Sequence, residues 1–338
     1  MRRRNILARS LGSLARKYRA FQEAWILPWF CGGCISAIPL WTFDIFVLIA
    51  KLTSTCVMAI VRVIIPPIKK NLCGETILVT GAGSGIGREL ALQLAELGAT
   101  IICWDKDERR NNALVEEIRK KDGDCYGYTL DVTMRDQVSA LATHMRRHLA
   151  DVTMVISNAG ALNYAPICQL RPDAVVKLIN VNLLSHIWII QAFLPSMIER
   201  RQGHIIAINS SLGLMPCADM TSYCAAKFGL RGLMDSLSEE LRLDTWTKNI
   251  TTTSVYLGTV STGLYPTPSH RFVSYYSEIS AEKAARTIIE GIRKNKKCIC
   301  IPTFLKLLLD LHNLLPYRVR IIFTDFFNFG SRGWFCFC

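Results

Sequence analysis

Short apolar runs alternate with longer amphipathic stretches in the middle of the chain. Several runs rich in Ile, Val, Thr or Cys have strand character: residues 76–80, 100–104, 153–157, 204–209, 251–256 and 297–302. Apolar positions at helical spacing fill the intervals, as in 88–97 and 221–243. Strands that alternate with helices predict one α/β domain over residues 72–302, built on a doubly wound parallel sheet with helices on both faces.

The region before this domain is apolar enough for a membrane. Residues 24–43 hold no charged side chain. These 20 residues are about the number that a helix needs to cross a hydrocarbon core. A second apolar run, 45–65, is broken by two basic residues. We therefore expect a membrane anchor over 24–68. It is either a spanning helix or a re-entrant hairpin, and a buried core helix is the alternative.

The region after the domain is apolar in a different way. Leucines recur near helical spacing over 302–329, with Lys306, Asp310 and His312 among them. This pattern predicts C-terminal amphipathic helices that lie on a bilayer or against the domain and do not span a membrane. We expect residues 303–338 to form a membrane-associating tail.

The positive charge gathers next to the predicted anchor. The net charge is +13, and the first 74 residues hold 11 basic and two acidic residues. The arm over residues 1–23 is strongly basic and adjoins an apolar segment. The charge therefore favours an anionic membrane surface as a partner, and we expect no nucleic acid.

The cysteines predict neither a disulfide scaffold nor a metal site. The chain has 13 cysteines, an odd number, and several lie in apolar runs where a thiol acts as a small apolar group. Cys31 and Cys34 have CxxC spacing, but no second pair follows, so we expect no metal. We expect a reduced domain that faces the cytosol. Cys336 and Cys338 lack a C-terminal prenylation motif, and palmitoylation of this pair stays open.

A glycine-rich turn joins the first predicted strand to the first helix. Glycines allow the backbone to approach a pyrophosphate closely, and the helix N-terminus attracts the phosphate charge. The residues that we expect to contact the dinucleotide here are Gly81, Ser84, Gly85, Ile86 and Gly87.

An acid stands at the end of the second predicted strand. Asp105 follows Gly87 by 18 residues, near the spacing of about 20 typical of a carboxylate that binds the adenosine ribose. Such a carboxylate repels a 2′-phosphate, so NAD is favoured. Arg88 and Lys106 are nearby cations that leave NADP open, and an ordinary turn acid is the alternative interpretation of Asp105.

The TGxxxGIG spacing and several later motifs resemble the short-chain dehydrogenase/reductase family. Tyr223 and Lys227 form the YxxxK signature; Ser210 precedes Tyr223 by 13 residues, and Asn182 precedes Ser210 by 28. The resemblance implies a Rossmann-type fold and an NAD(P)-dependent enzyme acting on CH–OH, with a catalytic tetrad of Asn182, Ser210, Tyr223 and Lys227. Ser211 is adjacent, but the spacing favours Ser210.

The resemblance also assigns coenzyme contacts further along the chain. It implies that Asp131 and Val132 lie near the adenine, that Asn158, Ala159 and Gly160 border the coenzyme, that Thr262 contacts the nicotinamide amide, and that Tyr223 and Lys227 also bind coenzyme. Leucine stands at position 257, before Gly258, where the family usually has proline. We expect an altered loop there without loss of the chemistry.

The residues of the signature have a physical logic of their own. Tyr223 and Lys227 are four positions apart, so both lie on one face of a helix. A phenol with a pKa near 10 is a poor base at neutral pH, and a neighbouring ammonium favours the phenolate. Ser210 would hold the substrate oxygen, and the resemblance gives Asn182 a water that links Lys227 to solvent. Alone, the pair could be an ordinary helix pair.

Particular stretches resemble the membrane-associated branch with retinol dehydrogenases and 17β-hydroxysteroid dehydrogenases of endoplasmic reticulum and lipid droplets: 104–105, 180–188 and 301–316. This implies a lipophilic alcohol or carbonyl as substrate, the same membranes as location, and a homodimer. His186 also fits the branch pattern and is expected to be a packing residue. The aromatic segment 264–279 is the expected lid over an apolar ligand.

Two other functions stay open at this stage. One is an NADPH-dependent reductase of retinal or another carbonyl, which uses the same residues in the opposite direction. The other is a lipid-droplet scaffold that keeps the fold without turnover. The complete set of Asn182, Ser210, Tyr223 and Lys227 argues against the scaffold.

Overall fold

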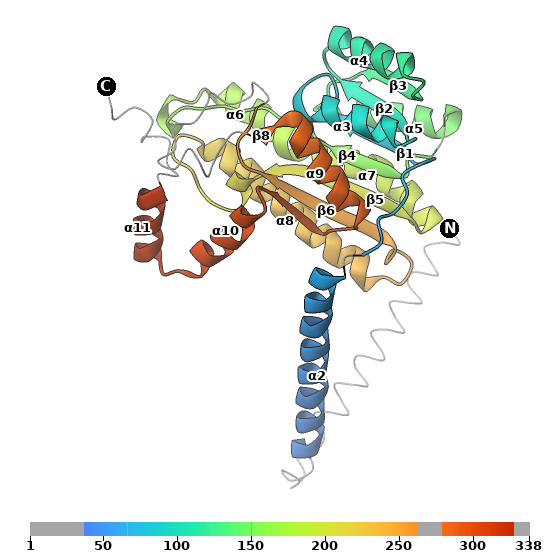
Figure 1. The fold of residues 1–338 in the computed structure, drawn as a ribbon. Helices are drawn as coiled ribbons and strands as arrows, with labels where there is room; N and C mark the ends of the chain where they lie inside the picture. Colours follow the sequence, from blue (N-terminus) through green and yellow to red (C-terminus); the bar gives the residue numbers. More distant parts are fainter. Residues whose placement is uncertain (1–36, 66, 150, 262–278, 328–338) are drawn as a thin grey trace, which may run out of the picture. The chain divides into compact units, whose positions relative to one another are not determined.

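Seven parallel strands form the main sheet, in the order β3-β2-β1-β4-β5-β6-β9 (Figure 1). This computed structural model describes residues 37–65, 67–149, 151–261 and 279–327. The strands are β1 (Thr76–Thr80), β2 (Thr100–Asp105), β3 (Cys125–Thr129), β4 (Met154–Ser157), β5 (Gly203–Ser210), β6 (Ile250–Leu257) and β9 (Cys298–Ile301). A short parallel pair, β7 (Val260–Ser261) and β8 (Ile279–Ser280), forms a second sheet.

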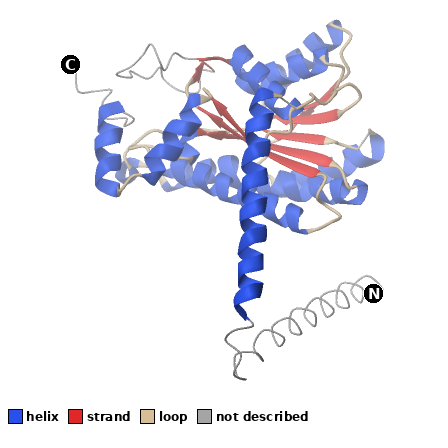
Figure 2. Cartoon of the chain, turned by 60° about the horizontal axis from the view of Figure 1, so that its bottom comes forward, coloured by secondary structure: helices blue, strands red, loops and turns tan. Residues whose placement is uncertain are grey.

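Helices cover both faces of this sheet, shown in Figure 2 with the strands between them. One face packs against α3 (Gly85–Glu96), α4 (Glu108–Lys120) and α9 (Ala281–Arg293). The other face packs against α5 (Arg135–His148), α7 (Ser185–Arg200) and α8 (Thr221–Leu243). The predicted doubly wound α/β fold is confirmed.

Burial on two sides explains the apolar strand runs. Along β1, Ile77 and Val79 pack with α3 and α9, while Leu78 points to the opposite face and packs with α5 and α7. All five residues of β1 are buried. A strand that is covered on both faces has a continuous run of apolar residues instead of an alternating pattern. This is why β1 can be recognised in the sequence.

The strand order predicts a binding site at the carboxyl ends of the central strands β1 and β4. From β1 the chain proceeds outward to β2 and β3, and from β4 it proceeds the other way to β5, β6 and β9. Loops that leave the carboxyl ends of β1 and β4 diverge at this reversal, and ligands of open α/β sheets bind there.

Between β4 and β5, residues 172–200 form one continuous helical segment with a wider turn inside it. A short 3₁₀ turn, η1 (Ile167–Gln169), precedes α6 (Pro172–Ile179); the π turn η2 (Asn180–Leu184) then leads into α7. The hydroxyl of Ser185 donates to the carbonyl oxygen of Val181 at 2.6 Å. Such π turns occur frequently at functional sites, and this one carries Asn182.

The C-terminal region forms two helices, in line with the amphipathic helices that the pattern predicts. They are α10 (Phe304–Leu314) and α11 (Tyr317–Phe327), with Pro316 between them. The residue before a proline is forced out of the helical conformation, which ends α10. Leu305 and Leu309 pack against the sheet beside Cys300, while the opposite side of α10 is exposed and apolar.

The N-terminal helix α2 (Ala37–Ile64) belongs to a contact unit of its own, residues 1–68, separate from 69–338. Its window Asp44–Val61 has a mean hydropathy of 1.9, none of it buried, and is long enough to cross a membrane. It coincides with the second apolar run, and residues 24–36 of the first run lie outside the described residues. Residues 172–200 pass the same hydropathy test, but they pack against the sheet and α5 as part of the core.

Two of the three buried histidines among the described residues, His204 and His186, have a lowered pKa, and the tautomer of His204 is fixed. His204 lies between Lys70 and Thr253: its Nδ1 is 3.0 Å from Lys70 Nζ, and its Nε2 is 2.8 Å from Thr253 Oγ1. Thr253 donates its hydroxyl hydrogen to the carbonyl oxygen of Lys296, so it accepts from Nε2–H. Nδ1 then accepts from the Lys70 ammonium, and the ring is neutral. Burial and the Lys70 charge lower the pKa of His204 well below its usual range.

The second buried histidine lies next to the predicted tetrad. His186 of α7 is fully buried, and neither ring nitrogen has a hydrogen-bond partner among the described residues. Burial, with the nearby positive charge of Lys227, lowers the pKa of His186 to about 3. This neutral buried ring agrees with the expected packing role.

Both histidines make the fold less stable in acid. Between the folded pKa and the unfolded value near 6.5, the unfolded chain binds a proton that the folded chain does not, so stability falls as the pH drops. For His186 this window runs from about 6.5 down to about 3, at about 1.4 kcal/mol per pH unit. Thermal unfolding of the full chain in detergent at several pH values measures this slope. His186→Phe should reduce it and His144→Gln, on the surface, should not; an unchanged slope in His186→Phe would contradict the account.

Candidate active site

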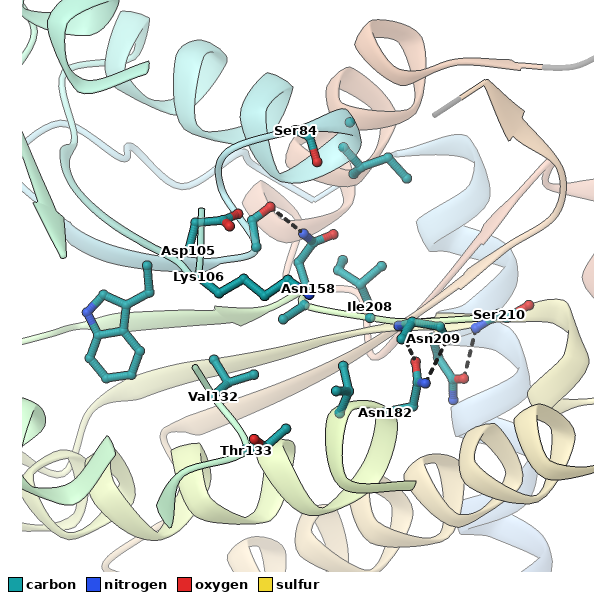
Figure 3. A pocket seen from close by; sticks show the side chains of 18 of the residues that line it. Ser84, Asp105, Lys106, Val132, Thr133, Asn158, Asn182, Ile208, Asn209 and Ser210 are labelled. Atoms are coloured by element: carbon teal, nitrogen blue, oxygen red, sulfur yellow. Dashed lines mark hydrogen bonds between the residues drawn. The ribbon is translucent and has the colours of Figure 1, made fainter. Parts of the chain in front are cut away.

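A pocket of ≈ 610 Å³ lies at the carboxyl ends of the central strands (Figure 3). Of the predicted site residues that the structure describes, all but Gly87 line it: Gly81, Ser84, Gly85, Ile86, Asp105, Asp131, Val132, Asn158, Ala159, Gly160, Asn182, Ser210, Tyr223 and Lys227. Thr262 and most of the expected lid segment lie outside the described residues.

The glycine-rich turn approaches the pocket with bare backbone. Gly81 and Gly85 have φ values of +64° and +55°, which residues with a side chain rarely adopt. Gly87 lies under the turn, where a Cβ atom would overlap the carbonyl oxygen of Gly81. Helix α3 begins at Gly85 and carries no acid in its first turn, so its partial positive charge faces the pocket uncompensated. This is a cradle for a phosphate group.

Asp105 is held in place by the backbone on both of its oxygens. Oδ2 accepts from the N–H of Gly83 at 2.8 Å, and Oδ1 accepts from the N–H of Asp107 at 2.9 Å. A Cβ on Gly83 would lie 3.0 Å from Oδ2, so the turn closes tightly on the carboxylate. Lys106 and Arg110 also line this end of the pocket. Such a fixed carboxylate suits ribose hydroxyls, with two cations nearby.

The two loops that diverge from β1 and β4 are tied together. Asn158 donates from Nδ2 to the carbonyl oxygens of Thr80 and Gly81, at 3.0 and 3.2 Å. The hydroxyl oxygen of Thr80 accepts from the N–H groups of Asn158 and Ala159, at 3.0 and 3.2 Å. These four bonds hold the floor of the pocket rigid. Thr80 begins the TGxxxGIG motif but was not among the predicted site residues.

Asn182 is fully buried and joins the π turn to the loop after β4. Its Nδ2 donates to the carbonyl oxygens of Ala161 and Leu178, at 2.7 and 3.0 Å, and its Oδ1 accepts from the N–H of Ala161 at 3.3 Å. The side chain is therefore occupied by protein groups and sets the position of the turn.

Ser210 is the last residue of β5 and lines the pocket, whereas Ser211 is not among the lining residues. The Oγ of Ser210 accepts from the N–H of Leu212 at 3.2 Å. Its hydroxyl hydrogen can then point into the pocket. The position agrees with the spacing argument that favours Ser210 over Ser211.

Tyr223 and Lys227 lie side by side on α8, both 4% exposed. The Lys227 Nζ is 5.6 Å from the centre of the Tyr223 ring and donates to the carbonyl oxygen of Ile208 at 3.3 Å. Burial lowers the pKa of Lys227 to about 8. The ammonium is therefore still predominantly charged at pH 7 and favours the phenolate form of a neighbouring tyrosine.

The two residues that precede Ser210 also line the pocket, although they were not among the predicted site residues. They are Ile208 and Asn209, which both bind Lys227. The sequence offers a weak signal for Asn209, since a polar side chain at the end of an apolar strand is buried here. The signal for Ile208 is absent, because its contact is made by a main-chain carbonyl oxygen.

The pocket fits a nicotinamide dinucleotide. The glycine cradle, the fixed Asp105 and the Tyr223–Lys227 pair line one cavity, and they would hold the pyrophosphate, the adenine ribose and the nicotinamide end, respectively. The bound coenzyme would supply or accept the hydride. The chain's own contribution would be to hold it and to control the proton on the alcohol oxygen.

Comparisons with known proteins agree with this geometry. A family model described as short chain dehydrogenase matches residues 75–270. Epidermal retinol dehydrogenase 2 of Mus musculus is 32% identical over 286 residues, covering 84% of this chain and 92% of that protein. The 17-beta-hydroxysteroid dehydrogenase 13 of Homo sapiens is 30% identical over 285 residues, covering 84% and 94%.

Solved structures agree as well. A short chain dehydrogenase/reductase from Burkholderia phymatum in complex with NAD has a TM-score of 0.66 at 22% identity, covering 72% of this chain and 94% of that one. A metagenomic short-chain oxidoreductase in complex with NADP has a TM-score of 0.58 at 28% identity, covering 68% and 96%. With the family model spanning more than half of its length, the chain belongs to the short-chain dehydrogenase/reductase family and is an NAD(P)-dependent oxidoreductase acting on CH–OH groups.

Proposed function

We propose that this enzyme is anchored to a membrane and transfers a hydride between NAD and a lipophilic alcohol or carbonyl, of the retinol or 17β-hydroxysteroid class. The observation that carries the proposal is the buried Tyr223–Lys227 pair in a dinucleotide pocket, on a chain with apolar segments at both ends. The relatives named for retinol and 17β-hydroxysteroids support the substrate class.

The proposed chemistry assigns a role to each tetrad residue. During oxidation the phenolate form of Tyr223, which the Lys227 ammonium stabilises, takes the proton of the alcohol and becomes the phenol. Ser210 donates a hydrogen bond to the substrate oxygen, since its Oγ already accepts from Leu212 N–H. Asn182 keeps the π turn and the loop after β4 together, which fixes the wall beside the pair.

NAD is the proposed coenzyme in preference to NADP. The Asp105 carboxylate is fixed by Gly83 and Asp107 at the expected adenine-ribose end, where it can accept from ribose hydroxyls. A 2′-phosphate there would meet like charge. The charge of Arg110, which also lines this end of the pocket, is compensated by its ion pair with Asp107, at 3.1 Å between Nε and Oδ2.

The proposed membrane contacts lie at the two ends of the chain. Helix α2 exposes a continuous apolar surface. On α10 and α11 the exposed apolar side chains are Phe304, Leu307, Leu311, Leu314, Tyr317, Val319, Ile321, Ile322 and Phe326. We propose a basic arm over 1–23, an anchor over 24–68, the catalytic domain over 72–302 and a membrane-associating tail over 303–338. We also propose a location at the endoplasmic reticulum or lipid droplets with the domain facing the cytosol, and a homodimer.

Replacing the proposed base tests the activity. Membranes from cells that express the chain are incubated with all-trans-retinol or estradiol and NAD or NADP, and coenzyme reduction is followed. We expect turnover with at least one alcohol, and a loss in kcat/KM of about 10²- to 10⁴-fold in Tyr223→Phe. The control Tyr126→Phe, outside the pocket, should match the wild type. Equal rates in wild-type, Tyr223→Phe and empty membranes would contradict the proposal.

Removing the proposed ribose carboxylate tests coenzyme choice. Asp105→Ala removes the charge that opposes a 2′-phosphate, so the ratio of kcat/KM for NAD over NADP should fall by about 10-fold or more, equivalent to about 1.4 kcal/mol. Asp124→Ala, at the residue that precedes β3 and outside the pocket, is the matched control. A wild type that already prefers NADP, or an unchanged ratio in Asp105→Ala, would count against NAD.

Charges placed on α2 test the anchor. A lysine at the centre of a spanning helix costs about 3 kcal/mol, so Ile49→Lys, Leu52→Lys and Met58→Lys together should weaken membrane insertion of the full chain. The fraction that resists alkaline carbonate extraction is measured. We expect the wild type and the body variant Met134→Lys to stay in the membrane and the triple variant to be released. Retention of the triple variant would show that α2 is not the anchor.

A further inference from the structure

Ile208 and Asn209, at the end of β5, both contact Lys227 of α8, and Asn209 also contacts Ser210. The carbonyl oxygen of Ile208 accepts from Lys227 Nζ at 3.3 Å. Asn209 donates from Nδ2 to the main-chain carbonyl oxygen of Lys227 at 3.1 Å, and its Oδ1 accepts from the N–H of Ser210 at 2.8 Å. Lys227 is therefore held at its main chain and at its ammonium by neighbouring residues of one strand.

Asn209 joins strand and helix through one planar group. Its side chain lines the pocket beside Ser210 and is 3% exposed (Figure 3). The amide needs a donor on one side, for the Lys227 carbonyl, and an acceptor on the other, for the Ser210 N–H. Of the side chains of this size, asparagine alone offers both. Aspartate keeps the acceptor and loses the donor; alanine loses both.

The turn after Ser210 is shaped to leave room for this amide. A Cβ on Gly213 would lie 2.8 Å from the Lys227 carbonyl oxygen and 2.9 Å from Asn209 Oδ1. Contacts that short are not tolerated between real side chains and backbone. The helical turn η3 (Ser211–Gly213) therefore approaches α8 closely only because position 213 has no side chain.

We propose that Asn209 is a positioning residue that sets the distance between Ser210 and Lys227, and thereby between the substrate oxygen and Tyr223. Its consequence for turnover rests on the proposed function above. Ser210 and Lys227 lie on different elements, and the rigid amide of Asn209 connects them directly. A displacement of about 1 Å between reacting groups can lower the rate about 100-fold. Losing this connection should therefore lower kcat strongly while changing the unfolding temperature little.

The test compares two buried asparagines that both donate to main-chain carbonyl oxygens. Asn111 of α4 is equally buried and donates to Cys103 and Tyr128, at 3.2 and 3.1 Å, outside the pocket. The full-length variants Asn209→Asp, Asn209→Ala and Asn111→Asp are purified in detergent. Three quantities are measured: kcat with the alcohol that the wild type oxidises, the Kd for NADH, and amide hydrogen exchange by mass spectrometry.

We expect kcat to fall about 10- to 100-fold in both Asn209 variants, with the Kd for NADH unchanged. Hydrogen exchange should rise in the peptides that cover 208–213 and 223–231. Asn111→Asp should instead raise exchange in β2 and β3, lower the unfolding temperature and leave kcat near the wild type. Asn209→Asp retains the contact to the Ser210 N–H and loses only the contact to the Lys227 carbonyl oxygen. The fall in kcat of this variant therefore measures the contribution of the Lys227 contact.

Two results would overturn the inference. One is a kcat loss in the Asn209 variants no larger than in Asn111→Asp. The other is unchanged exchange in both peptides. The exchange measurement needs no substrate. If the wild type oxidises no alcohol, the proposed function fails, and faster exchange in 208–213 and 223–231 still supports the Asn209 contact while unchanged exchange refutes it.

Discussion

A buried ammonium group beside a phenol is the constraint on which the site depends. Lys227 is almost completely buried, so its charge has lost most of its water, and burial lowers its pKa to about 8. The group stays predominantly charged at neutral pH because this pKa is still above 7, and its Nζ donates to the carbonyl oxygen of Ile208. A charged ring at position 186 would repel it. The neutral ring of His186 therefore adds no repulsion beside the ammonium that acts on Tyr223.

Short polar side chains fix the loops around this pair. Asp105 binds the backbone of the glycine-rich turn, Asn158 ties that turn to the loop after β4, and Asn182 ties the same loop to the π turn. Asn209 completes the series on the other side of the pocket. Each of these side chains forms hydrogen bonds with main-chain groups. The pocket is thus rigid before a ligand arrives, which lowers the entropy cost of binding.

The sequence predicted the fold well where strands are buried on both faces. Runs such as that of β1 are continuous and unambiguous, whereas β3, an edge strand with Gly127 at its centre and partly exposed neighbours, gave no range. The site residues could be predicted because the glycine-rich motif and the YxxxK spacing can be recognised directly in the amino-acid sequence. Asn209 and Thr80 could not be assigned from spacing alone, because their partners lie on other elements and are main-chain atoms. The break at Pro316 was present in the sequence and outweighs the helical period of the leucines.

The central claim is that Tyr223 and Lys227 act on a nicotinamide ring bound in this pocket. The measurement that tests it most directly is a crystal structure of the full chain with NAD bound. The account predicts the pyrophosphate on the turn of Gly81 to Gly87, the adenine ribose on Asp105, and the nicotinamide within reach of the Tyr223 hydroxyl. A dinucleotide bound elsewhere, or a tyrosine and lysine turned away from its ring, would contradict it.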